Sequence, residues 1–260
     1  MTNLEKYLAP IKQFGIQQGD VLFVSSDVRR LLFGYYEQYD EMPSLNDIID
    51  YLQLLVGEKG TLIFPTYNWG FCRGTAWNYY KTKCETGSLC TAALKRKDFR
   101  RTLHPIYSFA VWGKGQEELC QLMNTSSFGS DSPFAWLDQK HAKNLIIDVS
   151  FTGCLTFVHY VEQMSGVVTY RYEKNFTADY TDANGHTCAR TYSMFVRDLD
   201  LDVVNDFDAM EEQLLADGIA QRQLIQDVPI TLLDMHASLA PMLDDIRNNR
   251  SRKLCKYKGQ

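Results

Sequence analysis

The stretch VLFVSS, residues 21–26, is the segment that decides the fold class. It is a nearly continuous apolar run that begins after Gly19-Asp20 and ends in two serines. Such a run is typical of a strand that is covered on both faces, because neither face meets water. A second run of the same kind, TLIFPT at 61–66, follows further along the chain. Both runs predict buried strands of one sheet.

The segment between these two strands carries a helix start signal. Ser44 and Asp47 match a capping box, and NDIIDYLQLLVG behind them has apolar residues at helical spacing. Two more apolar runs, YSFAVW (107–112) and NLIIDVS (144–150), predict further strands. Additional helices are predicted over 3–14, 88–96 and 115–123 and over the segment that follows residue 150. The first two thirds of the chain therefore alternate strand and helix, which favours an α/β layered sheet.

The pattern changes after residue 165. GVVTYRYEK (166–174) and HTCARTYSMFVRD (186–198) alternate like antiparallel strands, with a turn signal at Asn184-Gly185. Helices are predicted over 206–217 and 231–248. We expect one domain over 1–260, with an α/β body at 1–165 and a β-hairpin and helical part at 166–260.

Composition excludes several functions. The 260 residues carry a net charge of -5, which disfavours nucleic-acid binding through phosphate neutralisation. No apolar run approaches the roughly 18 residues of a membrane span, and the N-terminus lacks the apolar core of a signal peptide. We therefore expect a cytoplasmic protein that binds neither membrane nor nucleic acid. The seven cysteines are odd in number and scattered, so we expect reduced thiols and no metal site.

The octet TFVHYVEQ, residues 156–163, places His159 three residues before Glu162. Residues three apart share one face of a helix. One interpretation is a core histidine with a polar neighbour. The other is an acid-base pair, because a carboxylate fixes the tautomer of a histidine and raises its basicity. Such a histidine could take a proton from an amine or a hydroxyl group.

Three other stretches place polar groups near strand ends. VSSDVRR (24–30) ends the first strand, where open α/β sheets bind ligands. RTLHPIYSFAVWG (101–113) contains an X-Pro entry to the next strand. SSFGSDSPF (126–134) is a loop of small residues whose backbone N–H groups can hold phosphates or carbonyls. Each stretch also has a purely structural interpretation: a capped turn, an X-Pro turn with a packed tyrosine, and an ordinary surface loop.

Taken in this order, the stretches resemble the aminoglycoside 3-N-acetyltransferase family, also called the antibiotic N-acetyltransferase family. The matching motifs are a serine pair after the first strand, GTLIFPT (60–66), HPIYS (104–108) with AVWG (110–113), FGSDSP (128–133) and TFVHYVE (156–162). The chain departs from the family at three places. Val24 and Tyr107 each replace a motif histidine, and Leu155-Thr156 replaces an Asn-Thr pair.

The resemblance implies a mixed-sheet α/β/α sandwich with a β-rich C-terminal part, and an acetyl transfer from acetyl-CoA to a sugar amine. It implies that His159 is the general base and that Glu162 supports it. Transfer is expected to be direct. Cys154, five residues before His159, is expected to pack on the opposite side and not to act as a nucleophile. The residues implied to bind the coenzyme are Ser25, Ser26, Asp27, Val28, Arg29, Ser108, Ser127, Phe128, Gly129 and Ser132.

The acceptor is inferred from residues 68–88, NWGFCRGTAWNYYKTKCETGS. This segment has one acid, Glu85, beside three cations and five large aromatic residues. Aromatic rings that stack on a base, beside cations that meet a pyrophosphate, suit a dTDP- or GDP-linked amino sugar for surface polysaccharide, such as the O-antigen of lipopolysaccharide. The residues predicted to bind the acceptor are Thr66, Tyr67, Trp69, Trp77, Tyr79, His104 and Tyr107.

Three alternatives stay open at this point. The aromatic segment can simply serve the core. The acceptor can be an aminoglycoside, which would make the protein an antibiotic-resistance enzyme. The protein can also be a non-catalytic relative that binds CoA. The paired strands after residue 165 are a candidate homodimer interface.

Overall fold

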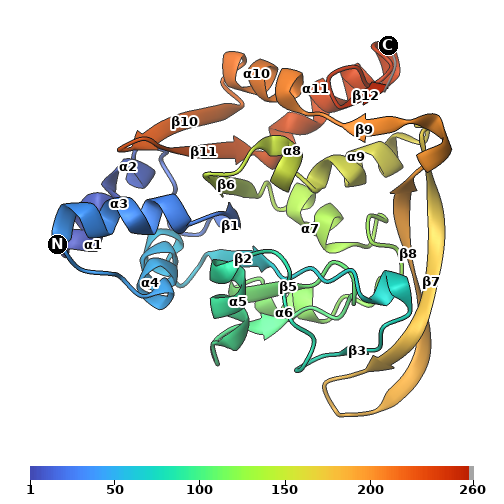
Figure 1. The fold of residues 1–260 in the computed structure, drawn as a ribbon, viewed down its shortest axis with the longest axis horizontal. Helices are drawn as coiled ribbons and strands as arrows, with labels where there is room; N and C mark the ends of the chain where they lie inside the picture. Colours follow the sequence, from blue (N-terminus) through green and yellow to red (C-terminus); the bar gives the residue numbers. More distant parts are fainter. Residues whose placement is uncertain (258–260) are drawn as a thin grey trace.

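The computed structural model describes residues 1–257, and a seven-stranded sheet runs through its centre (Figure 1). The strand order is β10-β11-β6-β1-β2-β5-β4. The bounds are β1 Val21–Ser26, β2 Thr61–Pro65, β4 Arg100–Arg101, β5 Phe109–Gly113, β6 Lys143–Ile147, β10 Ala220–Ile225 and β11 Val228–Asp234. β1 is parallel to β2 and β6, whereas β5 and β11 pair antiparallel with their neighbours. The expected mixed α/β sheet is confirmed.

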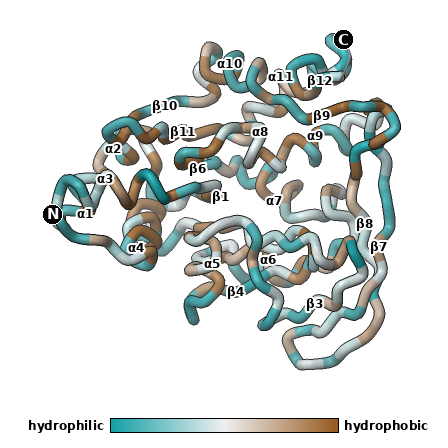
Figure 2. The backbone as a smooth tube through the Cα atoms, in the orientation of Figure 1, coloured by the Kyte–Doolittle hydropathy of each residue, from teal (hydrophilic) through white to brown (hydrophobic). Residues whose placement is uncertain are grey.

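Alternate residues of the central strands enter two different cores. On β1, Leu22 and Val24 pack into one core and Phe23 into the other. This alternation follows from the two-residue period of a strand. Both faces are therefore apolar, and in Figure 2 brown segments are visible along β11 and over part of β6. The four central runs were predicted as buried strands for this reason, and the structure confirms them.

Helices cover both faces of the sheet. The first core is covered by α1 to α5 and the second by α6 to α11. Their bounds are α1 Asn3–Tyr7, α2 Ala9–Lys12, α3 Arg29–Tyr39, α4 Leu45–Val56, α5 Ser88–Lys95, α6 Gln116–Cys120, α7 Pro133–Gln139, α8 Phe151–Cys154, α9 Phe157–Ser165, α10 Asp208–Ala216 and α11 Met235–Asn248. The capping box of α4 is present, with Ser44 and Asp47 each bonded to the other's backbone N–H.

Two helix predictions need correction. The predicted helix over 3–14 is broken into α1 and α2 at Leu8, two residues before Pro10, whose ring disfavours a continuous helix. The predicted helix from 231 begins only at Met235, where Asp234 caps its first turn. Residues 228–234 form β11 instead. The helix α3 was not predicted, and Gly34 in its middle weakens the helical signal.

The C-terminal part completes the main sheet. β11 pairs with β6 from Ile230 to Asp234, and β10 forms the sheet edge beyond it. Helix α11 packs against α9 and α7. The α/β body is therefore not confined to residues 1–165, because its sheet is closed by strands that come more than fifty residues later along the chain.

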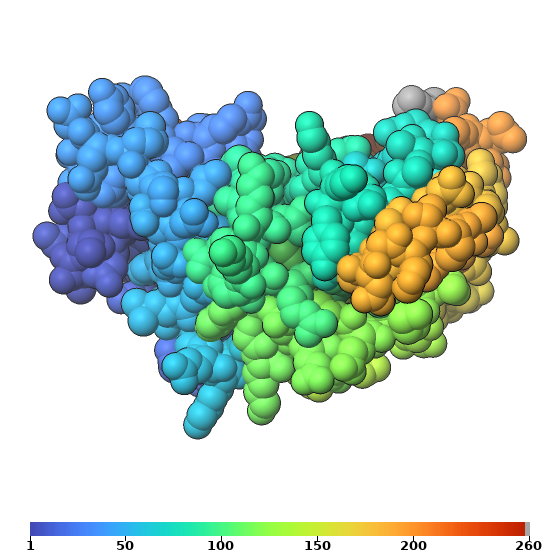
Figure 3. Space-filling view, turned by 90° about the horizontal axis from the view of Figure 1, so that it is seen from below, coloured from blue at the N-terminus to red at the C-terminus, as the bar shows by residue number. Residues whose placement is uncertain are grey.

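A long hairpin lies beside this body. β7 (Arg171–Thr181) and β8 (Thr187–Arg197) pair along their whole length, with Asn184-Gly185 in the turn as predicted. The short β3 (Trp77–Asn78) adds to β7. Figure 3 shows the hairpin running along the surface beside the residues near 75. The remaining elements are η1 Phe71–Arg73, η2 Leu199–Leu201, β9 Val203–Asn205 and β12 Cys255–Tyr257.

None of the helices formed by residues 1–257 combines the length and the apolar character needed to cross a lipid bilayer.

Candidate active site

His159 and Glu162 form a hydrogen-bonded pair on α9. The Nδ1 atom of His159 lies 2.7 Å from Oε2 of Glu162. The Glu162 side chain is 1% exposed and that of His159 is 14% exposed. Nδ1 of His159 therefore donates to the buried carboxylate, which leaves the Nε2 lone pair as the acceptor of a proton.

Two residues that follow α9 complete the environment of Glu162. Nε of Arg171 lies 2.8 Å from Oε2 of Glu162, and the Tyr170 hydroxyl donates to Oε1 at 2.7 Å. Burial alone acts to raise the pKa of Glu162, but His159, Arg171 and the Tyr170 hydrogen bond together lower it. Glu162 is therefore ionised, and both its oxygens are engaged.

The electrostatic setting keeps His159 neutral. Burial is the largest cause that lowers the pKa of His159, and the Arg171 charge is the second. Glu162 acts in the opposite direction, and Arg197 contributes further lowering. The net shift is downward, so the imidazole is unprotonated at neutral pH. An unprotonated imidazole is the form that a general base requires.

A cleft of about 300 Å³ lies next to this pair, at the carboxyl ends of β1 and β2. Its lining contains Ser25, Ser26, Tyr67 and Trp69, with Gly153 and Cys154 from the end of α8 and Thr156 from the start of α9. The last three residues also line a small hollow of about 40 Å³ that contains His159, Asn205 and Phe207. The structure thus brings four predicted site residues to the cleft next to His159: Ser25, Ser26, Tyr67 and Trp69.

Three hydroxyl groups of the cleft lack partners. Oγ of Ser25, Oγ of Ser26 and the Tyr67 hydroxyl are buried, and none makes a well-formed hydrogen bond within residues 1–257. A buried polar group without a partner costs free energy. Their position in a cleft means that a bound ligand with polar groups can satisfy them. This donor set fits the amide and carbonyl groups of a pantetheine arm.

The segment Asp27 to Arg29 joins β1 to α3. Asp27 accepts from the backbone N–H and the guanidinium of Arg29. The Arg29 hydrogen bond is the main cause that lowers the pKa of Asp27. Val28 is the N-cap of α3 and provides no side-chain cap. Asp27 therefore takes the first backbone N–H of α3, and no side chain of the N-cap residue bonds the N–H groups that follow.

Three predicted site residues form a structural network away from the cleft. The Ser108 hydroxyl is buried and bonds to the Thr66 side chain and to the Thr66 carbonyl oxygen. His104 is buried, and its Nδ1 accepts from the backbone N–H of Tyr107. Burial lowers the pKa of His104 to about 3. Ser108, Thr66 and His104 hold the turn into β5 and do not line the cleft.

The FGSDSP loop also serves structure. Ser127 donates to the backbone carbonyl of Ser193 at 2.7 Å, and the Ser132 side chain caps α7. A Cβ on Gly129 would lie 2.9 Å from the Asp131 carboxylate and 3.1 Å from Cβ of Ser126, so these side chains would have to shift to admit it. Phe128 is fully buried, and its ring packs edge-on against His159 at 5.6 Å between centroids. Phe128 is thus the member of this group whose ring packs against His159.

The aromatic residues of 68–88 divide into two sets. Trp77 is 1% exposed, stacks on Tyr180 and lies under the Arg101 guanidinium. Tyr79 donates to the Arg101 carbonyl oxygen. The structure assigns Trp77 to the core, because its ring is buried and stacked, and it places the half-buried Tyr79 at the edge of that core.

Tyr107 is also buried, where its ring packs on Tyr67 and Phe128. Burial raises the pKa of Tyr107 to about 12. Tyr107 therefore packs behind the residues that line the cleft, whereas Tyr67 and Trp69 line it directly.

The position of Cys154 corrects a prediction. Cys154 ends α8 and does not share a helix with His159, so it lines the same hollow instead of the opposite side. Burial raises the pKa of Cys154 to about 12. The thiol is therefore protonated at neutral pH, and only a thiolate is a strong nucleophile.

Sequence reasoning missed Thr156, Tyr170, Arg171, Asn205 and Phe207. Thr156 lay inside the octet, and its hydroxyl was a signal that could have been used. Tyr170 and Arg171 lay in a predicted strand whose direction relative to α9 was unknown. No signal marked Asn205 and Phe207.

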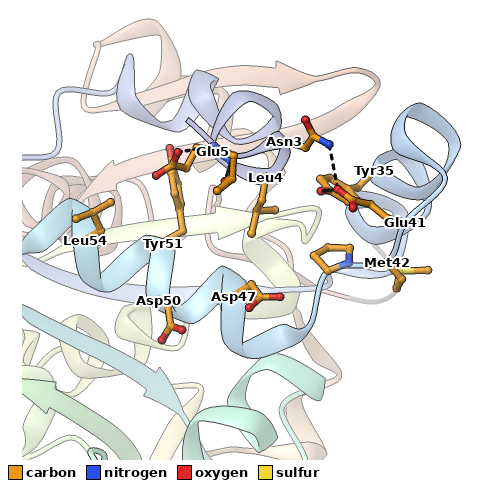
Figure 4. A pocket seen from close by; sticks show the side chains of 12 residues that line it. Asn3, Leu4, Glu5, Tyr35, Glu41, Met42, Asp47, Asp50, Tyr51 and Leu54 are labelled. Carbon is orange, nitrogen blue, oxygen red and sulfur yellow. Dashed lines mark hydrogen bonds between the residues drawn. The ribbon is translucent and has the colours of Figure 1, made fainter.

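A second hollow, of about 460 Å³, lies between α1, α3 and α4, far along the chain from His159 (Figure 4). Its acids are already engaged. Glu5 and Asp47 cap helices, Glu41 accepts from Asn3 and Tyr35, and Asp50 pairs with Arg96. This hollow therefore has no general base and no free carboxylate. Within residues 1–257, no three His, Cys, Asp or Glu side chains lie close enough to hold a metal ion.

A neutral histidine oriented by a buried carboxylate beside a ligand-sized cleft is the arrangement that general-base catalysis requires. The family model for aminoglycoside 3-N-acetyltransferase matches residues 33–243, so this chain belongs to that family. Acetyl-CoA is the acetyl donor in the family, which confirms the expected cofactor.

Solved structures agree with the fold. AAC-IIIb, in a binary complex with CoA, is 18% identical with a TM-score of 0.76, over 96% of this chain and 97% of that one. Aminoglycoside acetyltransferase AAC(3)-Xa is 18% identical with a TM-score of 0.78, over 95% and 92%. The YokD protein from Bacillus subtilis is 18% identical with a TM-score of 0.75, over 95% and 94%. No curated protein sequence matches this chain significantly.

Proposed function

We propose that this protein transfers the acetyl group of acetyl-CoA directly to an amino group of a sugar, with His159 as the general base. The observation that carries the proposal is the 2.7 Å contact between Nδ1 of His159 and the buried Glu162 carboxylate. That contact holds one tautomer and leaves Nε2 available beside the cleft. Family membership supports the same reaction.

His159 and Glu162 can assist the proton transfers that accompany the bond changes. The amine attacks the thioester carbonyl, so a C–N bond forms and the C–S bond breaks. His159 Nε2 takes the proton that the nitrogen must lose, and it can return that proton to the leaving sulfur. Glu162 stabilises the imidazolium that exists between these two steps. Cys154 forms no acyl-enzyme, because burial keeps its thiol protonated.

The coenzyme side is the cleft at β1 and β2. Ser25, Ser26 and Tyr67 offer partnerless hydroxyl groups to the pantetheine arm. The N-terminal turn of α3, entered through Asp27 and Val28, offers backbone N–H groups to phosphates. Binding here places the thioester next to Gly153, Cys154 and Thr156, which border both the cleft and the hollow of His159.

For the acceptor, we propose a nucleotide-linked amino sugar. An enzyme for a polycation needs carboxylates around the acceptor. Among the residues that line the cleft and the His159 hollow, Glu85 is the one carboxylate, and it already accepts from the Asn68 amide. The surface beyond His159 carries Lys174 and Arg197 instead. An acceptor with negative groups fits this surface better than a polycation does.

An aminoglycoside is the second candidate acceptor. The name of the family model and the names of the similar structures favour it. If it is correct, the protein is an antibiotic-resistance enzyme.

The test is release of free CoA thiol from acetyl-CoA, measured with a kanamycin-type antibiotic and with dTDP- and GDP-linked 3-amino and 4-amino sugars. We expect turnover of a nucleotide-linked sugar and its loss in His159→Ala. Turnover of the antibiotic alone would replace our acceptor with the second candidate. Thiol release with none of these amines, in a protein that still binds CoA, would make it a non-catalytic CoA-binding relative.

A further inference from the structure

A groove of about 390 Å³ runs along the end of the β7–β8 hairpin, opposite β9. Its lining contains Arg171, Lys174, Arg197 and Asn205 and no carboxylate. Tyr172, Phe176, Val196 and Leu199 supply the apolar part of the lining. The groove is therefore cationic and partly aromatic.

The charges of this groove are not neutralised within the protein. In residues 1–257, neither Lys174 nor Arg197 has an ion-pair partner or a side-chain hydrogen bond. Arginines elsewhere, such as Arg30, Arg96 and Arg222, pair with aspartate or glutamate. Arg171 is offset by Glu162, so the two cations left for a ligand are Lys174 and Arg197.

The register of the hairpin adds a second observation. Arg171 and Arg197 are directly opposite each other on β7 and β8. Like charges at directly opposed positions of neighbouring strands destabilise a hairpin. Glu162 compensates for one of the two charges only. A fold that keeps this arrangement gains stability when an anion joins it.

The groove and the hollow of His159 share one lining residue. Asn205 lines both the groove and the small hollow that contains His159. Arg171 contacts Glu162 directly, and the Arg197 charge acts on His159. The groove borders the hollow of His159 on the hairpin side, and the cleft at β1 and β2 borders it through Gly153, Cys154 and Thr156. These two sides of the hollow suit an acceptor and a donor.

We propose that this groove binds the phosphate-bearing part of the acceptor, with Lys174 and Arg197 on a nucleoside diphosphate and the Tyr172 ring against its base. Charge-assisted hydrogen bonds from lysine and arginine are the usual contacts of phosphate oxygens. Tyr172 is 48% exposed, so its ring is free to stack, unlike that of Trp77. This inference rests on the proposed acetyl transfer and names its substrate class.

The experiment has two independent readouts. The first is the Kd of dTDP, GDP and inorganic pyrophosphate, measured by calorimetry without turnover. The second is the KM, measured for a nucleotide-linked amino sugar, for glucosamine, which is an amino sugar without a phosphate, and for acetyl-CoA.

The variants are Lys174→Gln and Arg197→Gln, with Lys174→Arg as the substitution that keeps the charge. Lys59→Gln, at an exposed lysine after α4, is the matched control.

We expect each Gln variant to weaken nucleotide binding and to raise the KM of the nucleotide-linked acceptor about tenfold or more, from one lost charge-assisted contact. Lys174→Arg and Lys59→Gln should stay near wild type, as should the KM values for glucosamine and acetyl-CoA.

Three outcomes would overturn the proposal. The first is a nucleotide Kd that is unchanged in both Gln variants, and the second is no nucleotide binding by the wild-type protein. The third is a rise in the KM of acetyl-CoA instead of that of the acceptor, which would assign the groove to the phosphates of the coenzyme. Nucleotide binding that depends on Lys174 and Arg197, in a protein that releases no thiol with any acceptor, would support the groove while the proposed acetyl transfer fails. The two failures are therefore distinguishable.

Discussion

Arg171 and His159 contact the same oxygen atom of Glu162: Nε of Arg171 lies 2.8 Å and Nδ1 of His159 lies 2.7 Å from Oε2. One carboxylate therefore orients the base and neutralises a cation next to it. The two neighbours have opposite effects on the pKa of His159, because Glu162 stabilises the imidazolium and Arg171 destabilises it.

The pH dependence of kcat/KM follows from this geometry. His159 is active when unprotonated, and its pKa lies below the usual 6.5. Activity should therefore persist below pH 6.5 and fall only as the pH drops through the lowered pKa. Arg171→Gln removes a positive neighbour, so the acid limb should move to higher pH. Arg171→Lys keeps the positive charge and should therefore move the acid limb less. The charged groups around His159 are Glu162, Arg171 and Arg197, so Arg197→Gln should produce a smaller shift in the same direction.

The measurement is kcat/KM from pH 4.5 to 9 for wild type and the three variants. If Arg171 had a merely structural role, its loss would lower activity at every pH and leave the limb in place. A limb that moves to lower pH in Arg171→Gln would contradict the sign of the argument.

Removing the base and removing the nearby thiol should have very different effects. His159→Ala should lower kcat by about 10² to 10⁴, the usual contribution of a general base. Cys154→Ala should keep kcat within the same order of magnitude, because that thiol is protonated and direct transfer does not use it. Both variants should unfold at similar urea concentrations. Acetylated protein in a mass spectrum of acetyl-CoA-treated enzyme, lost in Cys154→Ala, would instead indicate an acyl-enzyme.

Glu162→Gln removes the negative charge beside His159 and keeps the shape of the side chain. The amide keeps the shape but loses the charge that holds Nδ1–H of His159 and pairs with Arg171. Breaking a buried ion pair by removing one partner costs about 3–5 kcal/mol, so the free energy of unfolding should fall strongly. The remaining folded enzyme should show a lower kcat. Full activity in Glu162→Gln would mean that the carboxylate neither orients nor stabilises the base.

Substitutions of Trp77 test whether the aromatic segment serves the core or binds the acceptor. Trp77→Ala should lower the free energy of unfolding by about 3–5 kcal/mol, because a large buried ring is lost from between Tyr180 and Arg101. Trp77→Phe should cost less. Urea denaturation measures both, and the KM for a nucleotide-linked acceptor should not change in the folded fraction. A selective rise in that KM, with stability unchanged, would restore Trp77 as an acceptor residue.

Ser132 tests whether the FGSDSP loop caps a helix or binds coenzyme. Its hydroxyl accepts from the Ala135 N–H. Ser132→Ala should cost about 1 kcal/mol and Ser132→Gly only a few tenths, as for other N-caps. Neither should alter the KM for acetyl-CoA. Equal increases of that KM in both variants would show that the hydroxyl contacts the coenzyme.

The predicted site residues that lie at the cleft or at the hollow beside it are those with a local signature. Ser25 and Ser26 follow an apolar run and therefore lie at a sheet edge. His159 and Glu162 are three apart in a helix and therefore touch. Trp77 and Ser108 lacked such a constraint. An aromatic ring and a hydroxyl group can both contact a ligand. They can equally be packed or hydrogen-bonded inside the core, and the sequence does not show which residues will lie next to them.

The sequence by itself determined the central strands, the capping box of α4, the Asn184-Gly185 hairpin and the His159–Glu162 pair. All of these depend on periodicity or on contacts a few residues apart. Only the tertiary structure decided that β11 joins β6, that the Arg171 side chain contacts Glu162, and that Lys174 and Arg197 line one cationic groove with Asn205. These are pairings between distant segments, and their geometry is set by how whole elements pack, which no local spacing encodes.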